Sequence, residues 1–269
     1  MNKQLKNNFL KNGYVIVRKF ITKNELIKLN EPLVKDKSII DHQIDQKDSK
    51  GLSSNVTVWS GNSNDLYSNY FKYDKLVQII QNLLEDEVYL YHAKLTLKKP
   101  LIGGSWDWHQ DFGYWFKNGC LFPDMASVYV ALNDATVENG CIKILEGSHR
   151  LGRLDHEIVN DQTSINSELL ELLKKKFKII NCILHEGDIL IFHSNILHCS
   201  EQNKSNISRN GLIGVYNSKH NNPIKKHHYP AYYKMNILNK KQIFSKSSIN
   251  KRRNYVKNKS EFEHYIDNY

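Results

Sequence analysis

The stretch Glu186-Gly-Asp-Ile-Leu-Ile-Phe-His-Ser-Asn-Ile-Leu-His-Cys-Ser200 begins with a glycine-containing turn signal and continues into a short apolar run. Short apolar and β-branched runs between such turn signals are typical of strands. Similar runs recur through the middle of the chain, at Val88–Tyr91, Lys94–Leu97, Ala126–Leu132, Cys141–Leu145, Lys178–Leu184, Asp188–Phe192 and Gly211–Tyr216. We therefore expect a mainly β protein with helical additions, whose core is a double-stranded β-helix, the cupin-like jelly roll of two sheets.

The residues before Val88 are expected to form a helical and loop part ahead of this core. Apolar residues have helical spacing around Phe9 and again at Lys75–Leu84, and Tyr14–Arg18 has the composition of a strand. Residues 37–65 are rich in Asp, Ser, Asn and Gly, which predicts a long loop.

A helix start is expected near residue 22. Thr22 and Glu25 have the spacing of a capping box, so a helix should begin at Lys23. Pro32 disfavours its continuation, which predicts an end near Asn30.

The length of 269 residues suits one large domain and leaves little room for a second core. We expect a single domain over residues 1–269, with a helical and loop part at 1–87, the jelly-roll core at 88–217 and a basic C-terminal extension at 218–269. A longer insertion is expected within the core at about Asp155–Lys176.

Hydrophobic residues make up 40% and charged residues 25%, as in soluble globular proteins. The longest apolar candidates, such as Ile189–Phe192, are too short for a membrane helix, and the N-terminus lacks the apolar region of a secretory signal. A cytoplasmic protein without membrane association is therefore expected. The four cysteines, Cys120, Cys141, Cys182 and Cys199, have no C-x-x-C spacing and are expected to be reduced thiols.

The net charge of +10 is concentrated at one end of the chain. Residues 219–269 contain twelve Lys or Arg and three Asp or Glu, so the rest of the chain is nearly neutral. No basic face across the main domain is indicated, and nucleic acid is not an expected partner. The sequence leaves the oligomeric state and the role of this basic extension open.

The segment Trp106-Asp-Trp-His-Gln-Asp111 carries the first chemical signal. On an extended segment, residues two apart point to the same face, so His109 and Asp111 can reach one ion. A second histidine would complete a set of two histidines and one carboxylate, which leaves octahedral iron(II) with open positions for a cosubstrate and oxygen. An isolated H-x-D motif is weak evidence, because it recurs by chance.

The second signal is a histidine after the strand that ends near Phe192. Both His193 and His198 are candidates for the distal ligand, and Arg209 follows His198 by eleven residues. A guanidinium suits a carboxylate because its planar fork donates two hydrogen bonds. The sequence has only six arginines, which makes Arg209 more informative.

On these residues the chain resembles the phytanoyl-CoA dioxygenase-like oxygenases, which include ectoine hydroxylase. The resemblance covers about Tyr91–Tyr216 and is carried by Trp108-His-Gln-Asp111, Tyr114-Trp115, Glu138-Asn-Gly-Cys141, Gly147-Ser-His149, Gly187-Asp188 and Leu197-His-Cys-Ser200 with Arg209. Within that family, the segments at residues 110–125 and 152–156 look most like members that hydroxylate aminoalkylphosphonates.

The resemblance implies iron(II), 2-oxoglutarate and O2 as cofactor and cosubstrates. It implies His109, Asp111 and His198 as the iron ligands and as the catalytic centre. It also implies that 2-oxoglutarate is bound by Arg209, Ser200, Lys94 and Tyr129, and that the substrate lies near His92 and Trp115. Lys94 departs from the family, since other members carry different residues there.

The implied reaction hydroxylates a C–H bond of a small polar molecule and releases succinate and CO2. A 2-aminoethylphosphonate-like compound is the most specific candidate for the substrate. Alternatives are an amino acid, ectoine-like, lipid or polyketide substrate, or a non-catalytic jelly-roll module that binds a ligand. Trp106 and Trp108 are interpreted as core aromatics, and Glu138–Cys141 as a turn. His149, His156 and His185 are assigned to turns, while contact of His227 and His228 with substrate stays open.

Overall fold

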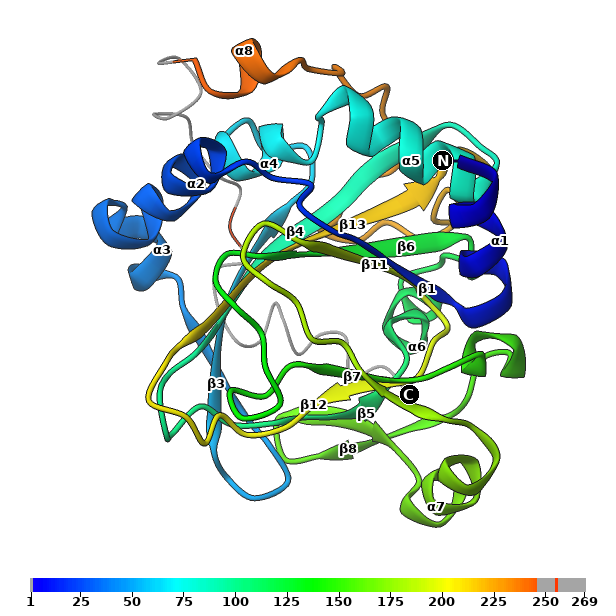
Figure 1. Cartoon of the computed structure of the whole chain (residues 1–269). Helices are drawn as coiled ribbons and strands as arrows, with labels where there is room; N and C mark the ends of the chain where they lie inside the picture. Colours follow the sequence, from blue (N-terminus) through cyan, green and yellow to red (C-terminus); the bar gives the residue numbers. More distant parts are fainter. Residues whose placement is uncertain (1, 246–254, 256–269) are drawn as a thin grey trace.

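Two antiparallel sheets form the centre of the computed structural model, which describes residues 2–245 and residue 255 (Figure 1). The larger sheet has the order β1 (Tyr14–Val17), β11 (Ile189–His193), β6 (Met125–Ala131), β13 (Arg209–Ser218), β4 (Val88–Lys98), β3 (Ser53–Ser60) and β2 (Ile44–Lys47). The smaller sheet has the order β10 (Ile179–Asn181), β7 (Ile142–Leu145), β12 (His198–Ser200) and β5 (Trp106–His109). The mainly β architecture is as predicted.

Figure 1 shows α2, α4 and α5 on the outer side of the larger sheet, whereas α6 lies between the two sheets. The helices are α1 (Asn2–Asn12), α2 (Lys23–Lys35), α3 (Lys37–Asp41), α4 (Leu66–Tyr70), α5 (Asp74–Leu84), α6 (Asp111–Lys117), α7 (Ser167–Lys176) and α8 (Lys240–Ile243), with short 3-10 turns at Ser148–Leu151 and Lys219–Asn221. This cover explains why β6 is buried at every position: one face meets the opposite sheet and the other meets helices.

The predicted capping box at the start of α2 is present. The Thr22 backbone N–H donates to the Glu25 carboxylate at 2.8 Å, and the Thr22 hydroxyl accepts from the Glu25 N–H at 3.4 Å. The predicted end near Asn30 is wrong, because α2 continues through Pro32 to Lys35. Proline removes one backbone hydrogen bond, but Pro32 itself is buried, so tertiary packing offsets that loss.

The prediction of a long loop at residues 37–65 is also wrong. The segment contains α3, β2 and β3, and β3 pairs with β2 on one side and β4 on the other. Seven of the eight residues of β3 are buried although several are polar. Their polar groups find partners inside the protein, for example Ser54 Oγ, which donates to the Gly104 carbonyl at 2.8 Å. Polarity alone therefore misidentified this strand.

The runs predicted separately at Val88–Tyr91 and Lys94–Leu97 form the single strand β4. Its pairing with β13 contains one irregularity: Val215 lies opposite His92, and Tyr216 lies opposite Leu90. Tyr91 is thus the extra residue of a β-bulge, which bends a strand and re-aims its side chains.

The expected insertion after residue 155 contains the hairpin of β8 (His156–Val159) and β9 (Gln162–Ile165), followed by α7. Of the basic extension, residues 246–254 and 256–269 lie outside the described residues. The four cysteines are buried and form no disulfide, in agreement with the expected thiols. Among the described helices, none has the length and apolar character needed to cross a membrane.

Candidate active site

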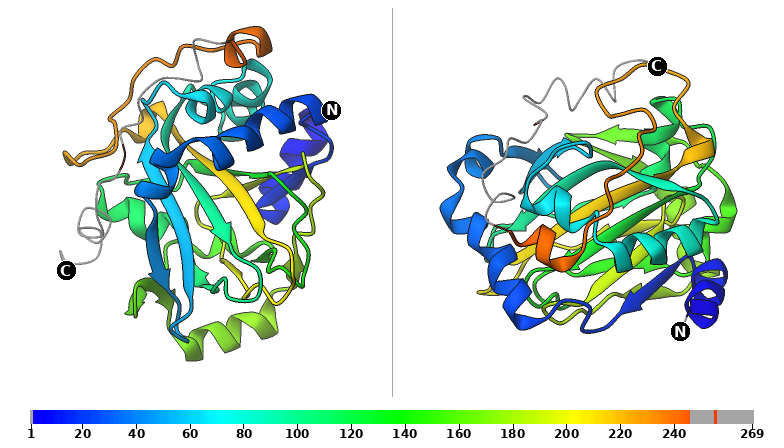
Figure 2. Two further views of the ribbon diagram at one scale, coloured as in Figure 1. Left: turned by 90° about the vertical axis from the view of Figure 1, so that its left-hand side faces the viewer. Right: turned by 90° about the horizontal axis from the view of Figure 1, so that it is seen from above.

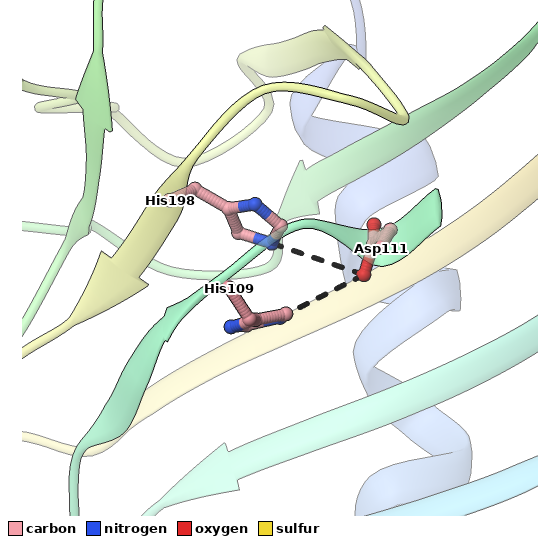
Figure 3. A group of neighbouring side chains, drawn as sticks. All are labelled: His109, Asp111 and His198. Atoms are coloured by element: carbon pink, nitrogen blue, oxygen red, sulfur yellow. Dashed lines mark ion pairs between the residues drawn. The ribbon is translucent and has the colours of Figure 1, made fainter. Parts of the chain in front are cut away.

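The structure brings His109, Asp111 and His198 together between the two sheets (Figure 3). Asp111 Oδ1 lies 3.7 Å from His109 Nε2 and 3.9 Å from His198 Nε2. Two donor atoms that share one ion at about 2.1 Å each are at most about 4.2 Å apart, so both distances fit a common metal ion. All three residues are buried.

The strand pairing explains this convergence. His109 ends β5 and His198 begins β12, and the two residues lie directly opposite each other in the antiparallel pair. Each imidazole is fixed by its Nδ1 atom, which lies 2.6 Å from the Asp107 carbonyl in His109 and 3.1 Å from the Ile196 carbonyl in His198. A carbonyl only accepts, so Nδ1 carries the proton and Nε2 keeps the lone pair that a metal ion needs.

Asp111 comes from the first turn of α6, two residues beyond His109. Its Oδ2 accepts a hydrogen bond from Ser127 Oγ at 2.8 Å, which leaves Oδ1 facing the imidazoles. Burial alone would raise the pKa of Asp111, but His198, Lys94 and His109 outweigh it and lower the pKa to about 2. The pKa of His109 falls to about 3 because of burial and the neighbouring His198. The site thus keeps the carboxylate ionised and His109 neutral, as a metal site requires.

Gln110 separates the two ligands and is held on several sides. Its side-chain amide donates to the carbonyls of Gly152 at 2.8 Å and Asn195 at 2.7 Å. Its backbone N–H donates to His156 Nε2 at 2.9 Å. These bonds keep Gln110 extended, with φ −109° and ψ 130°, so His109 and Asp111 face the same side.

One cavity beside the three ligands contains the residues predicted to bind 2-oxoglutarate. Arg209, Ser200, Lys94 and Tyr129 all line it, together with Asp111 and both histidines. The Arg209 guanidinium donates to the Gly140 carbonyl at 2.5 Å, so the predicted turn at Glu138–Cys141 also orients the arginine. Arg209 Nε and Tyr129 Oη are buried without a hydrogen-bond partner in the described part of the chain. Because buried donors are rarely left unpaired, this pair fits a carboxylate supplied by a ligand.

Lys98 lies behind this cavity and was not predicted as a site residue. It is 1% exposed, and its ammonium donates to Ser200 Oγ at 2.7 Å. Burial and the nearby Arg209 hold the pKa of Lys98 well below its usual range. Since the Ser200 oxygen accepts from Lys98, the Ser200 proton is directed elsewhere.

A second cavity is also lined by His109 and Asp111. His92 and Trp115, the two residues expected near the substrate, both line it, and Lys94 and Trp106 line both cavities. The remaining lining residues are Gln46, Val56, Val58, Tyr114, Asp161, Thr163 and Tyr229. We call this space the substrate cavity. His92 Nδ1 is buried there without a hydrogen-bond partner among the described residues.

Comparison with known proteins places this geometry in a family. The model of the phytanoyl-CoA dioxygenase (PhyH) family matches residues 9–211. This chain belongs to the phytanoyl-CoA dioxygenase family. The predicted family and dioxygenase class are thereby confirmed.

Among its relatives, the L-proline trans-4-hydroxylase of Streptomyces griseoviridis is 29% identical over 164 residues, which cover 55% of this chain and 61% of the hydroxylase. The ectoine dioxygenase of Nocardia farcinica is 25% identical over 240 residues, which cover 83% of this chain and 80% of that enzyme. The match thus spans less than two thirds of the proline hydroxylase.

The fold is shared with solved structures. The crystal structure of EctD from S. alaskensis with bound Fe matches with a TM-score of 0.71 and 22% identity, covering 87% of this chain and 82% of that one. The EctD structure with 2-oxoglutarate and 5-hydroxyectoine gives a TM-score of 0.70 at 21% identity, covering 83% and 78%. The predicted jelly-roll fold is confirmed, and the predicted cofactors agree with the ligands named for these structures.

Several other histidines lie outside the group of three ligands. His193, the alternative distal ligand, accepts through Nδ1 from the Asn195 backbone N–H at 3.0 Å. His149 Nε2 lies 3.1 Å from the Leu10 carbonyl, and His185 is exposed. His227 contacts Tyr91 Oη rather than lining the substrate cavity.

Sequence patterns missed residues that act through tertiary contacts. His156 was assigned to a turn, but it begins β8 and supports Gln110. Trp106 was interpreted as a core aromatic, but it lines both cavities. Ser127, Lys98 and Tyr229 carried no recognisable signal, because their partners are distant in sequence.

Proposed function

We propose that this chain is an iron(II)- and 2-oxoglutarate-dependent dioxygenase that hydroxylates a C–H bond of a small polar molecule and releases succinate and CO2. The observation that carries the proposal is the convergence of His109, Asp111 and His198 beside two cavities. One cavity is lined by Arg209, and the other is lined by His92 and Trp115. A set of two histidines and one carboxylate with open positions suits non-haem iron(II).

In this proposal the three convergent side chains hold the iron. Arg209 and Tyr129 then receive the far carboxylate of 2-oxoglutarate through their buried, unpaired donors, with the Ser200 hydroxyl beside them. When bound, iron and 2-oxoglutarate supply the oxidising chemistry, in which O2 and the cosubstrate yield succinate, CO2 and a hydroxylated product. The protein supplies orientation and exclusion of water, since the ligands and both unpaired donors are buried.

The substrate cavity favours a small molecule that bears charge. Lys94 offers a cation for a carboxylate or phosphonate, and His92 Nδ1 offers a buried hydrogen-bonding position. The relatives that act on L-proline and ectoine support a substrate with a charged amino or amidine nitrogen. We propose a 2-aminoethylphosphonate-like compound as one candidate, and an amino acid or ectoine-like compound as the alternative.

Lipid and polyketide substrates are less well supported. Val56 and Val58 are the aliphatic side chains among the described residues of the substrate cavity, and its other lining residues are aromatic, polar or charged. A long hydrocarbon chain would require burial of those polar groups without partners, which is costly.

Succinate formation by the iron-loaded protein tests the proposal. The panel should contain 2-aminoethylphosphonate, L-proline, other amino acids, ectoine and an acyl-CoA thioester. We expect one of the amino-bearing compounds to raise succinate above the uncoupled background and to gain one oxygen atom by mass spectrometry. Turnover of the acyl-CoA alone would contradict the substrate class, and 2-oxoglutarate binding without succinate from any compound would indicate a non-catalytic module.

A further inference from the structure

The chain between the 3-10 turn at Lys219–Asn221 and α8 has no regular structure, yet it buries Tyr229 with only 5% of its surface exposed. Figure 2 shows this segment in orange, running along the outside of the molecule from β13 to α8. Tyr229 lines the substrate cavity with His109 and Asp111. The C-terminal extension thus contributes a wall to the active site.

Specific hydrogen bonds fix the segment beside the cavity. The Tyr229 backbone N–H donates to His227 Nδ1 at 3.1 Å, so the His227 proton is on Nε2. Nε2 lies 3.0 Å from Tyr91 Oη, to which it donates, and Asn118 Nδ2 donates to the same oxygen at 3.2 Å. Farther along, Tyr233 Oη donates to the Gly61 carbonyl at 2.8 Å.

The β-bulge in β4 explains how Tyr229 contacts two consecutive residues of one strand. Its ring centroid lies 4.9 Å from that of Tyr91 and 4.7 Å from that of His92. Consecutive residues of a regular strand point to opposite faces, so they would not meet one ring. The extra residue at Tyr91 breaks that alternation at this position.

Three rings therefore form a continuous surface, which we call the aromatic wall: Trp115, His92 and Tyr229. The Tyr229 and His92 rings are stacked at an interplanar angle of 20°, and Trp115 meets His92 edge-on at a centroid distance of 5.9 Å. Burial and the nearby Lys94 keep the pKa of His92 well below its usual range, so this imidazole is neutral. Tyrosine and tryptophan rings attract a cation through their quadrupoles, and a neutral His92 beside them does not repel it.

We infer that Tyr229 is a specificity-determining residue of the substrate cavity, where the aromatic wall receives the ammonium-bearing side of the substrate. The anionic side then faces Lys94, which lines the same cavity. This inference rests on the proposed function and assigns to the extension a role in choosing the substrate. It also gives a reason for the hydrogen bonds that hold the segment against Tyr91 and Gly61.

The test compares pairs of compounds that differ in one charged group. Suitable pairs are L-proline with tetrahydrofuran-2-carboxylate, and 2-aminoethylphosphonate with propylphosphonate. Binding is measured calorimetrically to the full chain loaded with Co(II) and 2-oxoglutarate, in wild type and in Tyr229→Leu and Tyr229→Phe. Tyr232→Leu is the matched control, since Tyr232 lies on the same segment but donates to Glu87 instead of lining the cavity.

We expect wild type to prefer the ammonium member of at least one pair. Tyr229→Leu should reduce that preference by about five- to thirty-fold, the range of a desolvated cation–π contact. Tyr229→Phe should keep it within about threefold, because the ring remains, and Tyr232→Leu should leave it unchanged. The affinity for 2-oxoglutarate, measured in parallel, should not change in any variant and reports that the fold is intact.

The inference is overturned if Tyr229→Leu keeps the preference, or if it weakens both members of a pair equally. An equal effect of Tyr232→Leu would also overturn it. If wild type prefers the ammonium compound and the Tyr229 variants keep that preference, this inference alone is wrong. If wild type binds none of the four compounds, both the inference and the proposed substrate class are wrong.

Discussion

At the scale of single residues, Arg209 is the side chain whose loss should affect cosubstrate binding most selectively. Its Nε atom is buried without a partner while its other end is held by the Gly140 carbonyl. Hydrogen bonds to charged groups contribute about 1.5–3 kcal/mol each. We therefore expect Arg209→Gln to raise the KM for 2-oxoglutarate by about 10- to 100-fold, measured as succinate formation at varied 2-oxoglutarate concentration.

The control for this variant is Arg150→Gln. Arg150 is exposed and lies outside both cavities. The KM of the Arg150→Gln variant for 2-oxoglutarate should therefore equal that of wild type. Metal affinity should be similar in both variants, because neither arginine belongs to the three convergent ligands. An unchanged KM for 2-oxoglutarate in Arg209→Gln would show that this arginine does not bind the cosubstrate.

The two candidate distal histidines should differ sharply in metal binding. His198 Nε2 faces Asp111, whereas His193 Nδ1 accepts from a backbone N–H of its own turn. We expect His198→Gln to weaken Co(II) binding by more than about 100-fold, since loss of a ligand should exceed the 10- to 100-fold cost of losing an outer partner. His193→Gln should bind Co(II) like wild type. Absorption of the Co(II) complex during titration distinguishes the two.

At the scale of elements, sequence patterns worked where the cause was local. The capping box at Thr22 and the apolar run of β11 were recognised because neighbouring residues determine them. The strand β3 was missed because partners on both sides bury its polar residues. The passage of α2 through Pro32 depends on packing, which a local rule does not contain.

The residues of the candidate site also fall into those that local sequence predicts and those that depend on distant contacts. The motif around His109 and the spacing of His198 from Arg209 are linear features, so they could be found in the sequence. His156 accepts a hydrogen bond from Gln110, which is 46 positions away in the sequence. Lys98 donates to Ser200, which is 102 positions away. Such contacts follow only from the sheet pairing, which explains why these positions had no signal.

The β8–β9 hairpin should matter to the metal site through His156. Removing its Nε2 atom leaves the buried Gln110 N–H without an acceptor, which costs about 1–3 kcal/mol. Because Gln110 separates two ligands, we expect His156→Leu to weaken Co(II) binding by about 10- to 100-fold. The exposed His185→Leu is the control and should bind normally. Equal Co(II) affinity in the two variants would show that the hairpin does not position the ligands.

At the scale of the whole molecule, partly buried histidines connect stability to pH. Burial lowers the pKa of His193 to about 3, and the pKa values of His156 and His227 fall to about 4, chiefly through burial. All three lie below the ordinary value of 6.5, which applies to the unfolded chain. Between those values the unfolded state binds more protons, so the free energy of unfolding decreases as the pH falls.

The stability contributed by these histidines should be fully present above about pH 6.5 and should decline toward pH 4, with a slope of about 1.4 kcal/mol per pH unit for each histidine. Urea unfolding of the metal-free protein at pH 7, 6 and 5 measures this slope. His193→Asn removes one titrating group, so its slope should be smaller than that of wild type by about one such increment, whatever its stability at pH 7. Identical slopes would mean that His193 is protonated equally in the folded and unfolded chains, contrary to its packing against Phe9 and His149.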